Sequence, residues 1–264
     1  MFSLLIQRRE LLLNLIAREL KSRYKGSALG FLWSLLTPLF MAIIYVFFLR
    51  LLAGRGVPTE EIIIGVFAWQ FTASCVTGGM TAITGNANLV KKVFFPRVIL
   101  PTAVTFANLI NFLLSLVVQF VIVGGLLWWK GSHLSAWSLG LPVLIVDQTL
   151  FNLGLALLMA SANVYFRDTQ HLVGVLLSAW FFVSPVMYNL SFVERFAANR
   201  PLLMSLYLLN PIAPIITGYR AMILPGVTFP CSGFALAGLA AGLVFVWIGY
   251  AVFQRAQRNF ADML

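Results

Sequence analysis

Long stretches of apolar side chains are the feature that most restricts how this chain can fold. A transmembrane helix needs roughly 20 consecutive, mostly apolar residues. Six segments approach or exceed that length with almost no charged side chain, and they lie at about residues 31–52, 62–84, 98–128, 137–163, 172–188 and 232–253. Each is apolar throughout and does not alternate as the strands of a membrane barrel do. The sequence therefore predicts an all-α polytopic membrane protein with six transmembrane helices.

Composition excludes a water-soluble domain. Of the 264 residues, 61% are hydrophobic and only 10% are charged, whereas about a quarter of the residues in a typical soluble protein are charged. The mean hydropathy of +0.93 agrees with a chain that lies mostly within a bilayer.

Residues 1–28 are predicted to form an amphipathic interface helix ahead of the first span. Leucine and isoleucine recur there at spacings of three and four, and the basic residues lie chiefly on the other side: Arg8, Arg9, Arg18, Lys21, Arg23 and Lys25. A basic helix with an apolar stripe is typical of helices that lie in the membrane interface. Gly26 and Gly30 are predicted to form a flexible joint to the first span, in which Pro38 permits a kink.

The basic residues also predict the orientation of the chain. With both termini inside, twelve of the 18 lysines and arginines fall in cytoplasmic segments and six fall outside. Because Lys and Arg are enriched in cytoplasmic loops, both termini are predicted to be cytoplasmic. The net charge of +10 forms no nucleic-acid-binding motif, and we expect no nucleic-acid partner.

Residues 189–231, between the fifth and sixth spans, are too polar for a span and too apolar for a free loop. Asn210-Pro211 divides them, since Asn is a favoured N-cap and Pro a favoured first helical residue. Pro225-Gly226 ends the second part. Two short re-entrant helices in the outer interface are therefore predicted, because irregular backbone at membrane depth must be buried or line a cavity.

The chain lacks the sequence patterns of common enzymatic sites. It contains no His-Glu-x-x-His, no Gly-x-Ser-x-Gly and no Gly-x-x-x-x-Gly-Lys-Ser/Thr. Glu60 and Glu61 are predicted to be a solvated pair beside a helix start. Asp147 is the strongest ionisable candidate within a span, and we expect a structural or cavity-facing role for it rather than a proton relay. We expect no enzymatic activity, no metal site and no cofactor in this chain.

Aromatic side chains are frequent in the first and fifth spans. Such residues are ordinary in lipid-facing helices, which is the simpler interpretation of any one of them. Sugar rings, however, lay their apolar C–H faces on aromatic rings, and such weak contacts suit a polymer that slides. The residues predicted to line a polysaccharide path are Tyr45, Trp180, Phe181 and Tyr188.

Over nearly its whole length the chain resembles the ABC-2-type polysaccharide export permeases of the Wzm and TagG class. The resemblance rests on five segments in the order of that family: Arg18–Pro38, Leu89–Pro101, Asn163–Asp168, Ser184–Tyr188 and Asn210–Arg220. It implies a homodimer of six-helix subunits in the bacterial inner (cytoplasmic) membrane, with two separate Wzt-like ATPase subunits that bind ATP and Mg.

The resemblance also implies how the chain is divided. Residues 1–28 form the cytoplasmic interface helix, and residues 29–264 form the six-helix ABC-2 transmembrane domain. Within that domain, residues 85–97 form a cytoplasmic coupling helix and residues 189–231 form the outer gate helices. The residues expected to dock in the ATPase are Asn88, Lys91, Lys92, Phe94, Phe95 and Arg97.

The cargo that the resemblance implies is a polysaccharide carried on undecaprenyl diphosphate. We expect it to be O-antigen, with teichoic acid, capsule, or a small lipid or drug as alternatives. Lys21, Arg23 and Lys25 are predicted to meet the diphosphate at the loading side, because a charged fork of donors suits phosphate. The alternative for these three cations is contact with ordinary anionic membrane lipid, worth roughly 1 kcal/mol per charge.

Overall fold

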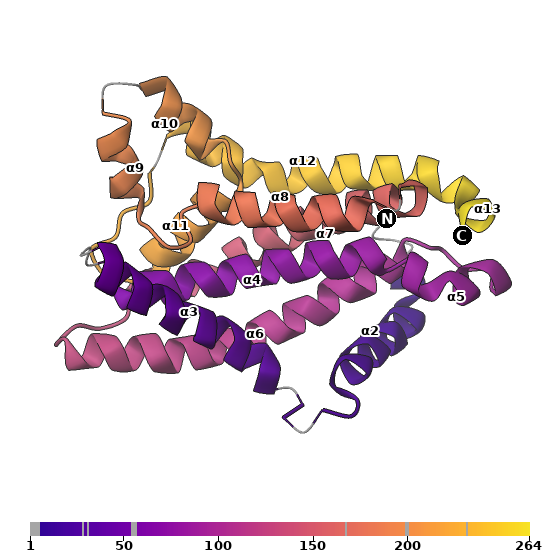
Figure 1. The fold of residues 1–264 in the computed structure, drawn as a ribbon, viewed down its shortest axis with the longest axis horizontal. Helices are drawn as coiled ribbons and strands as arrows, with labels where there is room; N and C mark the ends of the chain where they lie inside the picture. Colours follow the sequence, from indigo (N-terminus) through magenta and orange to yellow (C-terminus); the bar gives the residue numbers. More distant parts are fainter. Residues whose placement is uncertain are drawn as a thin grey trace.

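A computed structural model describes residues 6–27, 29–30, 32–53, 57–166, 168–198, 201–230 and 232–264. Helices joined by turns and short irregular stretches account for these residues, and no strand occurs among them. The long helices lie side by side along the molecule (Figure 1). They are α3 (Leu32–Ala53), α4 (Thr59–Thr81), α6 (Ile99–Trp129), α7 (Leu141–Tyr165), α8 (Thr169–Val183) and α12 (Gly233–Ala256).

Each apolar segment of the sequence corresponds to one of these helices. Among the described residues, four stretches are long and apolar enough to cross a membrane, namely Thr59–Thr81, Ile99–Trp129, Ala136–Tyr165 and Gly233–Asn259. Leu32–Phe48 and Thr169–Val183 are apolar but shorter, and one bent helix pair provides a possible fifth crossing. The chain is therefore an all-helical, multi-pass membrane protein, and the count of six spans stays a prediction.

Helix α7 packs closely against α4 and α12. A Cβ atom added to Gly79 would lie 2.4 Å from the Cβ atom of Ala156, so α4 and α7 approach at a distance that only glycine allows there. Gly154 of α7 meets the backbone of Phe245 in α12 in the same way. Small residues of this kind are what membrane helices use to pack closely.

Helix α2 (Arg9–Tyr24) lies against α6. Leu15 and Ile16 are buried in a cluster that includes residues of α6 and α7, whereas Leu13 is exposed. Gly26 and Gly30 both have positive φ angles, +78° and +48°, a conformation that L side chains rarely adopt. The turn between α2 and α3 thus depends on these two glycines.

The segment between α8 and α12 contains three short helices where the sequence predicted two. They are α9 (Leu190–Phe196), α10 (Pro201–Leu208) and α11 (Ile212–Ile223). Helices α10 and α11 meet at an angle of 80°, and Asn210-Pro211 lies at that break, as predicted. The Asn210 side chain accepts a hydrogen bond from the Ile212 amide (3.3 Å) and donates one to Ser184 Oγ (3.0 Å). Asn210 thus ties the break to the end of α8.

The two chain ends and the connector between α4 and α6 lie at one end of the bundle, and α9, α10 and α11 lie at the other (Figure 1). The connector comprises a 3-10 helix (Thr84–Asn86), α5 (Ala87–Lys92) and an extended stretch up to Arg97. The short C-terminal helix α13 (Phe260–Met263) packs against α5. The chain ends, the connector and α13, all in segments predicted to be cytoplasmic, therefore lie at the same end of the bundle (Figure 1).

Candidate functional site

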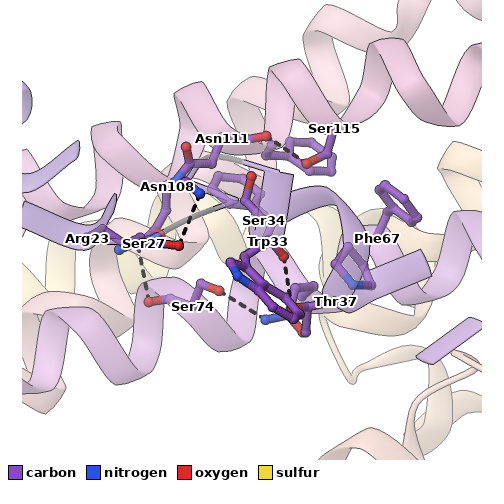
Figure 2. A pocket seen from close by; sticks show the side chains of 15 residues that line it. Arg23, Ser27, Trp33, Ser34, Thr37, Phe67, Ser74, Asn108, Asn111 and Ser115 are labelled. Atoms are coloured by element: carbon purple, nitrogen blue, oxygen red, sulfur yellow. Dashed lines mark hydrogen bonds between the residues drawn. The ribbon is translucent and has the colours of Figure 1, made fainter. Parts of the chain in front are cut away.

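A polar cavity of about 260 Å³ lies where α2 ends and α3 begins (Figure 2). Helices α4 and α6 form its opposite wall. Hydroxyl, amide and aromatic side chains make up most of the lining together with one arginine, and these residues are Arg23, Ser27, Gly30, Trp33, Ser34, Thr37, Pro38, Phe67, Gln70, Phe71, Ser74, Asn108, Asn111, Phe112 and Ser115. A concave site with aromatic walls and a few polar groups is typical of small-ligand binding.

Asn108 holds the arginine of this cavity in place. Arg23 Nη1 donates to Asn108 Oδ1 at 2.7 Å, and Asn108 Nδ2 donates to the Ser74 carbonyl at 3.1 Å (Figure 2). The Glu19 carboxylate lies 3.6 Å from Arg23 Nη2, and both side chains are about one-third exposed. An exposed pair of this kind contributes little. The guanidinium is therefore oriented mainly by an amide and keeps its charge available to the cavity.

The other two predicted phosphate-contacting residues lie in a different place. Lys21 and Lys25 line a groove of about 1030 Å³ between α2 and α6, together with Arg18. Among the residues that the structure describes, no carboxylate lines this groove, and the described lining residues are Asn14, Ala17, Arg18, Leu20, Lys21, Ser22, Lys25, Ile110, Asn111 and Leu114. We call it the cationic groove. Asn111 lines both the groove and the Arg23 cavity.

Arg18 was not predicted as a site residue, although the sequence contains a signal for it. Residues 18, 21 and 25 follow the spacing of three and four that puts side chains on one face of a helix. Arg23 is out of that register and faces the cavity on the other side. Helical spacing, rather than proximity in the sequence, thus divides the basic cluster into two sites.

Three of the four predicted aromatic residues come together around Trp69 of α4, which the sequence did not single out. The ring centroids of Trp69 lie 5.6 Å from those of both Trp180 and Phe181, and Tyr45 lies 5.3 Å from Phe181. Tyr188 lies apart, at the end of α8, where its hydroxyl bonds to the Val183 carbonyl at 2.9 Å.

A second cavity, of about 270 Å³, opens beside this aromatic cluster. Tyr45, Trp69 and Phe181 line it, but Trp180 does not. The Trp180 indole instead donates to Asn210 Oδ1 at 2.8 Å, which ties α8 to the α10–α11 break. Gln70 lines both this cavity and the Arg23 cavity. The two cavities are therefore neighbours along α4, with Gln70 in the wall between them.

The predicted ATPase-docking residues of the connector divide into an outer and an inner set. Four are exposed, and they are Asn88, Lys91, Lys92 and Phe94. Phe95 is half-buried against the cluster that contains Leu15 of α2. Arg97 donates a hydrogen bond to the Gln257 carbonyl in the C-terminal segment. Phe95 and Arg97 thus face the protein and hold the connector, whereas the outer set faces away.

Arg220 is buried, although it is one of the six cations that the sequence predicted to lie in the outer segments. Arg220 of α11 is 2% exposed and donates to three backbone carbonyls: Glu61 at 3.0 Å, Tyr188 at 2.8 Å and Val186 at 3.0 Å. It joins α11 to the start of α4 and to the turn after α8. Its burial depends on packing among distant segments, which sequence spacing does not reveal.

The prediction of a solvated carboxylate pair at Glu60-Glu61 is wrong. Glu60 and Glu61 are 7% and 8% exposed. Lys130, at the end of α6, donates to both Glu60 carboxylate oxygens at 2.8 and 2.9 Å. The Glu61 carbonyl accepts from Arg220. Cations from α6 and α11, far apart in the sequence, thus pack over the first turn of α4 and cover it.

Asp147 of α7 is partly buried, and its side chain lies against α12. A Cβ atom added to Gly242 would lie 2.5 Å from Asp147 Oδ1. The expectation of a structural or cavity-facing role for Asp147 stays a prediction.

Comparisons with known proteins point to one family. The sequence profile described as ABC-2 type transporter matches residues 10–224. The O-antigen export system permease protein RfbA of Myxococcus xanthus is 35% identical over 262 residues, which cover 98% of this chain and 97% of that protein. A Klebsiella pneumoniae protein of the same name is 28% identical, covering 97% and 95%. The polysialic acid transport protein KpsM of Escherichia coli is 23% identical and covers 91% of each chain.

Proposed function

Because the chain belongs to the ABC-2 type transporter family, we propose that it is the membrane subunit of an ATP-driven exporter of lipid-linked polysaccharide. The observation that carries the proposal is the similarity, along nearly the whole chain, to proteins named for O-antigen export. O-antigen is therefore the first candidate cargo. Capsular polysaccharide is the second, because the Escherichia coli relative is named for polysialic acid transport.

The cationic groove and the Arg23 cavity support a cargo with a phosphate-bearing end. Lys21 in the groove and Arg23 in the cavity lie on two sides of one helix, α2, and Lys25 in the groove directly follows its last residue. Charge-assisted hydrogen bonds to phosphate are about twice as strong as neutral ones. We assign the undecaprenyl diphosphate head group to this region, at the cytoplasmic face of the inner membrane.

The polymer itself is assigned to the aromatic cavity. Tyr45 and Phe181 line it beside Trp69, and Gln70 connects it with the Arg23 cavity. Rings that offer their faces, together with a neighbouring amide, match the alternating apolar and hydroxyl surfaces of a sugar. The predicted Trp180 supports this cavity from behind, and Tyr188 belongs to the α8–α10 junction.

The partners in this proposal are a second copy of the chain and two ATP-binding cassette subunits. The exposed connector residues Lys91, Lys92 and Phe94 are the proposed contact with the ATPase. ATP and Mg are bound by that partner, and this chain supplies the path for the cargo.

The test is a gene deletion, and the surface polysaccharide that is lost, O-antigen or capsule, identifies the cargo. Loss of the chain in its native host is expected to abolish surface polysaccharide and to strand lipid-linked polymer in the cytoplasm, where extraction and gel analysis detect it. A matched complementation arm compares the wild-type chain with Lys21→Gln/Lys25→Gln, which is expected to reduce export, and with Arg9→Gln, which removes a charge outside the groove. Normal surface O-antigen and capsule in the deletion strain would refute the proposed function.

A further inference from the structure

Arg18 of α2 contacts the connector directly. Its Nη2 donates to Asn86 Oδ1 at 2.5 Å, across 68 residues of sequence. Asn86 is the last residue of the 3-10 helix that precedes α5, and its own Nδ2 donates to the Ala82 carbonyl at 2.8 Å. That second bond fixes the amide with its oxygen toward Arg18. The first turn of the connector is therefore held to α2 by one guanidinium.

The far end of the connector is held in a different way. Arg97 donates to the Gln257 carbonyl, and Phe95 packs against the hydrophobic cluster that includes Leu15. Between these two attachments, Lys91, Lys92 and Phe94 are exposed. The connector is thus attached at both ends, and α5 between them packs against α13 and buries Val90 while its charged side chains face outward. The Arg97 attachment is half-buried, whereas Arg18 is exposed to solvent, so the attachment at Asn86 is the one that a solute can reach.

Arg18 also lines the cationic groove with Lys21 and Lys25. A phosphate that enters the groove meets three cations, and no carboxylate is found among the lining residues that the structure describes. Asn86 offers Arg18 a neutral acceptor, whereas a phosphate offers a charged acceptor that matches the planar fork of donors. The two acceptors compete for the same guanidinium, and the charged one is the stronger.

We propose that Arg18 senses phosphate in the cationic groove. When a phosphate group binds there, the Arg18 guanidinium breaks its hydrogen bond to Asn86 and binds the phosphate instead, and the connector loses that contact. The inference rests on the proposed function, because only an exporter with an ATPase subunit has a partner whose hydrolysis the connector can control. In the empty groove the Arg18–Asn86 bond restrains the connector and keeps hydrolysis slow. With phosphate bound, the restraint at Asn86 is released and hydrolysis rises.

The variants that test this proposal change Asn86 and leave all three groove cations in place. Asn86→Ala and Asn86→Asp both lose the Nδ2 bond to the Ala82 carbonyl, so a difference between them comes from the acceptor that faces Arg18. Asn86→Ala removes the restraint, and the ATPase rate without probe is expected to rise to the wild-type stimulated rate. Asn86→Asp strengthens the restraint, and the half-maximal probe concentration is expected to rise about threefold, the scale of an exposed ion pair.

The measurement uses the full complex with its ATPase in phosphatidylcholine nanodiscs. Farnesyl diphosphate serves as the lipid-linked probe and inorganic pyrophosphate as the free one, and a third arm adds phosphatidylglycerol to the discs. Stimulation by pyrophosphate as well as farnesyl diphosphate assigns the effect to the phosphate alone. Stimulation by phosphatidylglycerol alone would overturn the proposal, because the groove would then answer to bulk lipid.

The controls separate this inference from the proposed function. Arg9→Gln removes a charge from α2 outside the groove and is expected to respond as the wild type does. If no probe stimulates the wild-type complex, the proposed function loses its support. If the wild type responds and both Asn86 variants match it, the sensing role of Arg18 is refuted while the proposed function stands.

Discussion

Arg220 is among the largest fully buried side chains of the described structure, and its guanidinium satisfies three backbone carbonyls at once. The Val186 and Tyr188 carbonyls lie outside the helices, and a buried carbonyl left without a partner costs about 1–3 kcal/mol. Arg220→Met is therefore expected to lower the free energy of unfolding by on the order of 3 kcal/mol or more, as measured by chemical unfolding in detergent micelles. Arg195→Met, which removes an exposed cation of α9, is the control and should leave stability unchanged. Equal stability of the two variants would contradict the bonding described for Arg220.

The individual residues show where sequence reasoning succeeds and where it stops. Arg23 and Lys21 were identified as cations at the start of the first span, and both line concave sites. Their division between two sites follows from helical register, which the sequence contains. Arg220 and Trp69 were not predicted as important residues. Their partners lie on other elements of the fold, and no local spacing in the sequence indicates those contacts.

At the scale of helices, the crossing of α4 and α7 depends on Gly79. Gly79→Val introduces a side chain where a Cβ atom alone would lie 2.4 Å from Ala156 Cβ. Overpacking of this kind typically costs about 1–3 kcal/mol, and we expect a loss of stability in that range with reduced yield of folded protein. Gly125→Val in α6 is the matched control, because a Cβ atom there meets nothing within 4 Å. A Gly79→Val protein as stable as the control would show that the two helices can separate without cost.

The exposed side chains of the connector and the partly buried Phe95 are expected to have different roles. Lys91→Ala/Lys92→Ala/Phe94→Ala changes only exposed side chains, so the chain is expected to fold normally and to lose coupling between ATP hydrolysis and export. Phe95→Ala removes a side chain that packs against the hydrophobic cluster that includes Leu15 and is expected to destabilise the fold itself. Thermal unfolding of the purified chain and polymer export in cells measure the two effects separately. If the triple variant exports normally, the exposed face is not the ATPase contact.

Helices were the most predictable elements because a long apolar run leaves a membrane chain few alternatives. The six predicted segments match α3, α4, α6, α7, α8 and α12 in position. Residues 189–231 were predicted less well, with two short helices expected and three found. Short helices there depend on contacts such as Asn210 with Ser184 and Trp180, and those contacts involve other elements.

At the scale of the whole molecule, the arrangement of the ends gives a prediction of orientation. Both termini, α5 and α13 lie at one end of the bundle, and α11 lies at the other (Figure 1). His133, after α6, is exposed and belongs to the α11 end, because the nearby Ser135 amide donates to the Ile223 carbonyl at 3.1 Å. Loops rich in Lys and Arg stay on the cytoplasmic side. Most of the lysines and arginines of this chain lie at the end with α2 and α5.

A cysteine introduced at each end tests this orientation. In a chain with Cys75 and Cys231 replaced by serine, His133→Cys is expected to react with a membrane-impermeant thiol reagent in intact spheroplasts. Lys91→Cys is expected to react only after the membrane is opened, because the proposed orientation puts α5 on the cytoplasmic side. Labelling of both sites in opened membranes is the control for accessibility. The reverse pattern would place the cationic groove on the exit side of the membrane, where it could not receive a diphosphate made in the cytoplasm. Both the predicted orientation and the assignment of the groove to cargo loading would then be wrong.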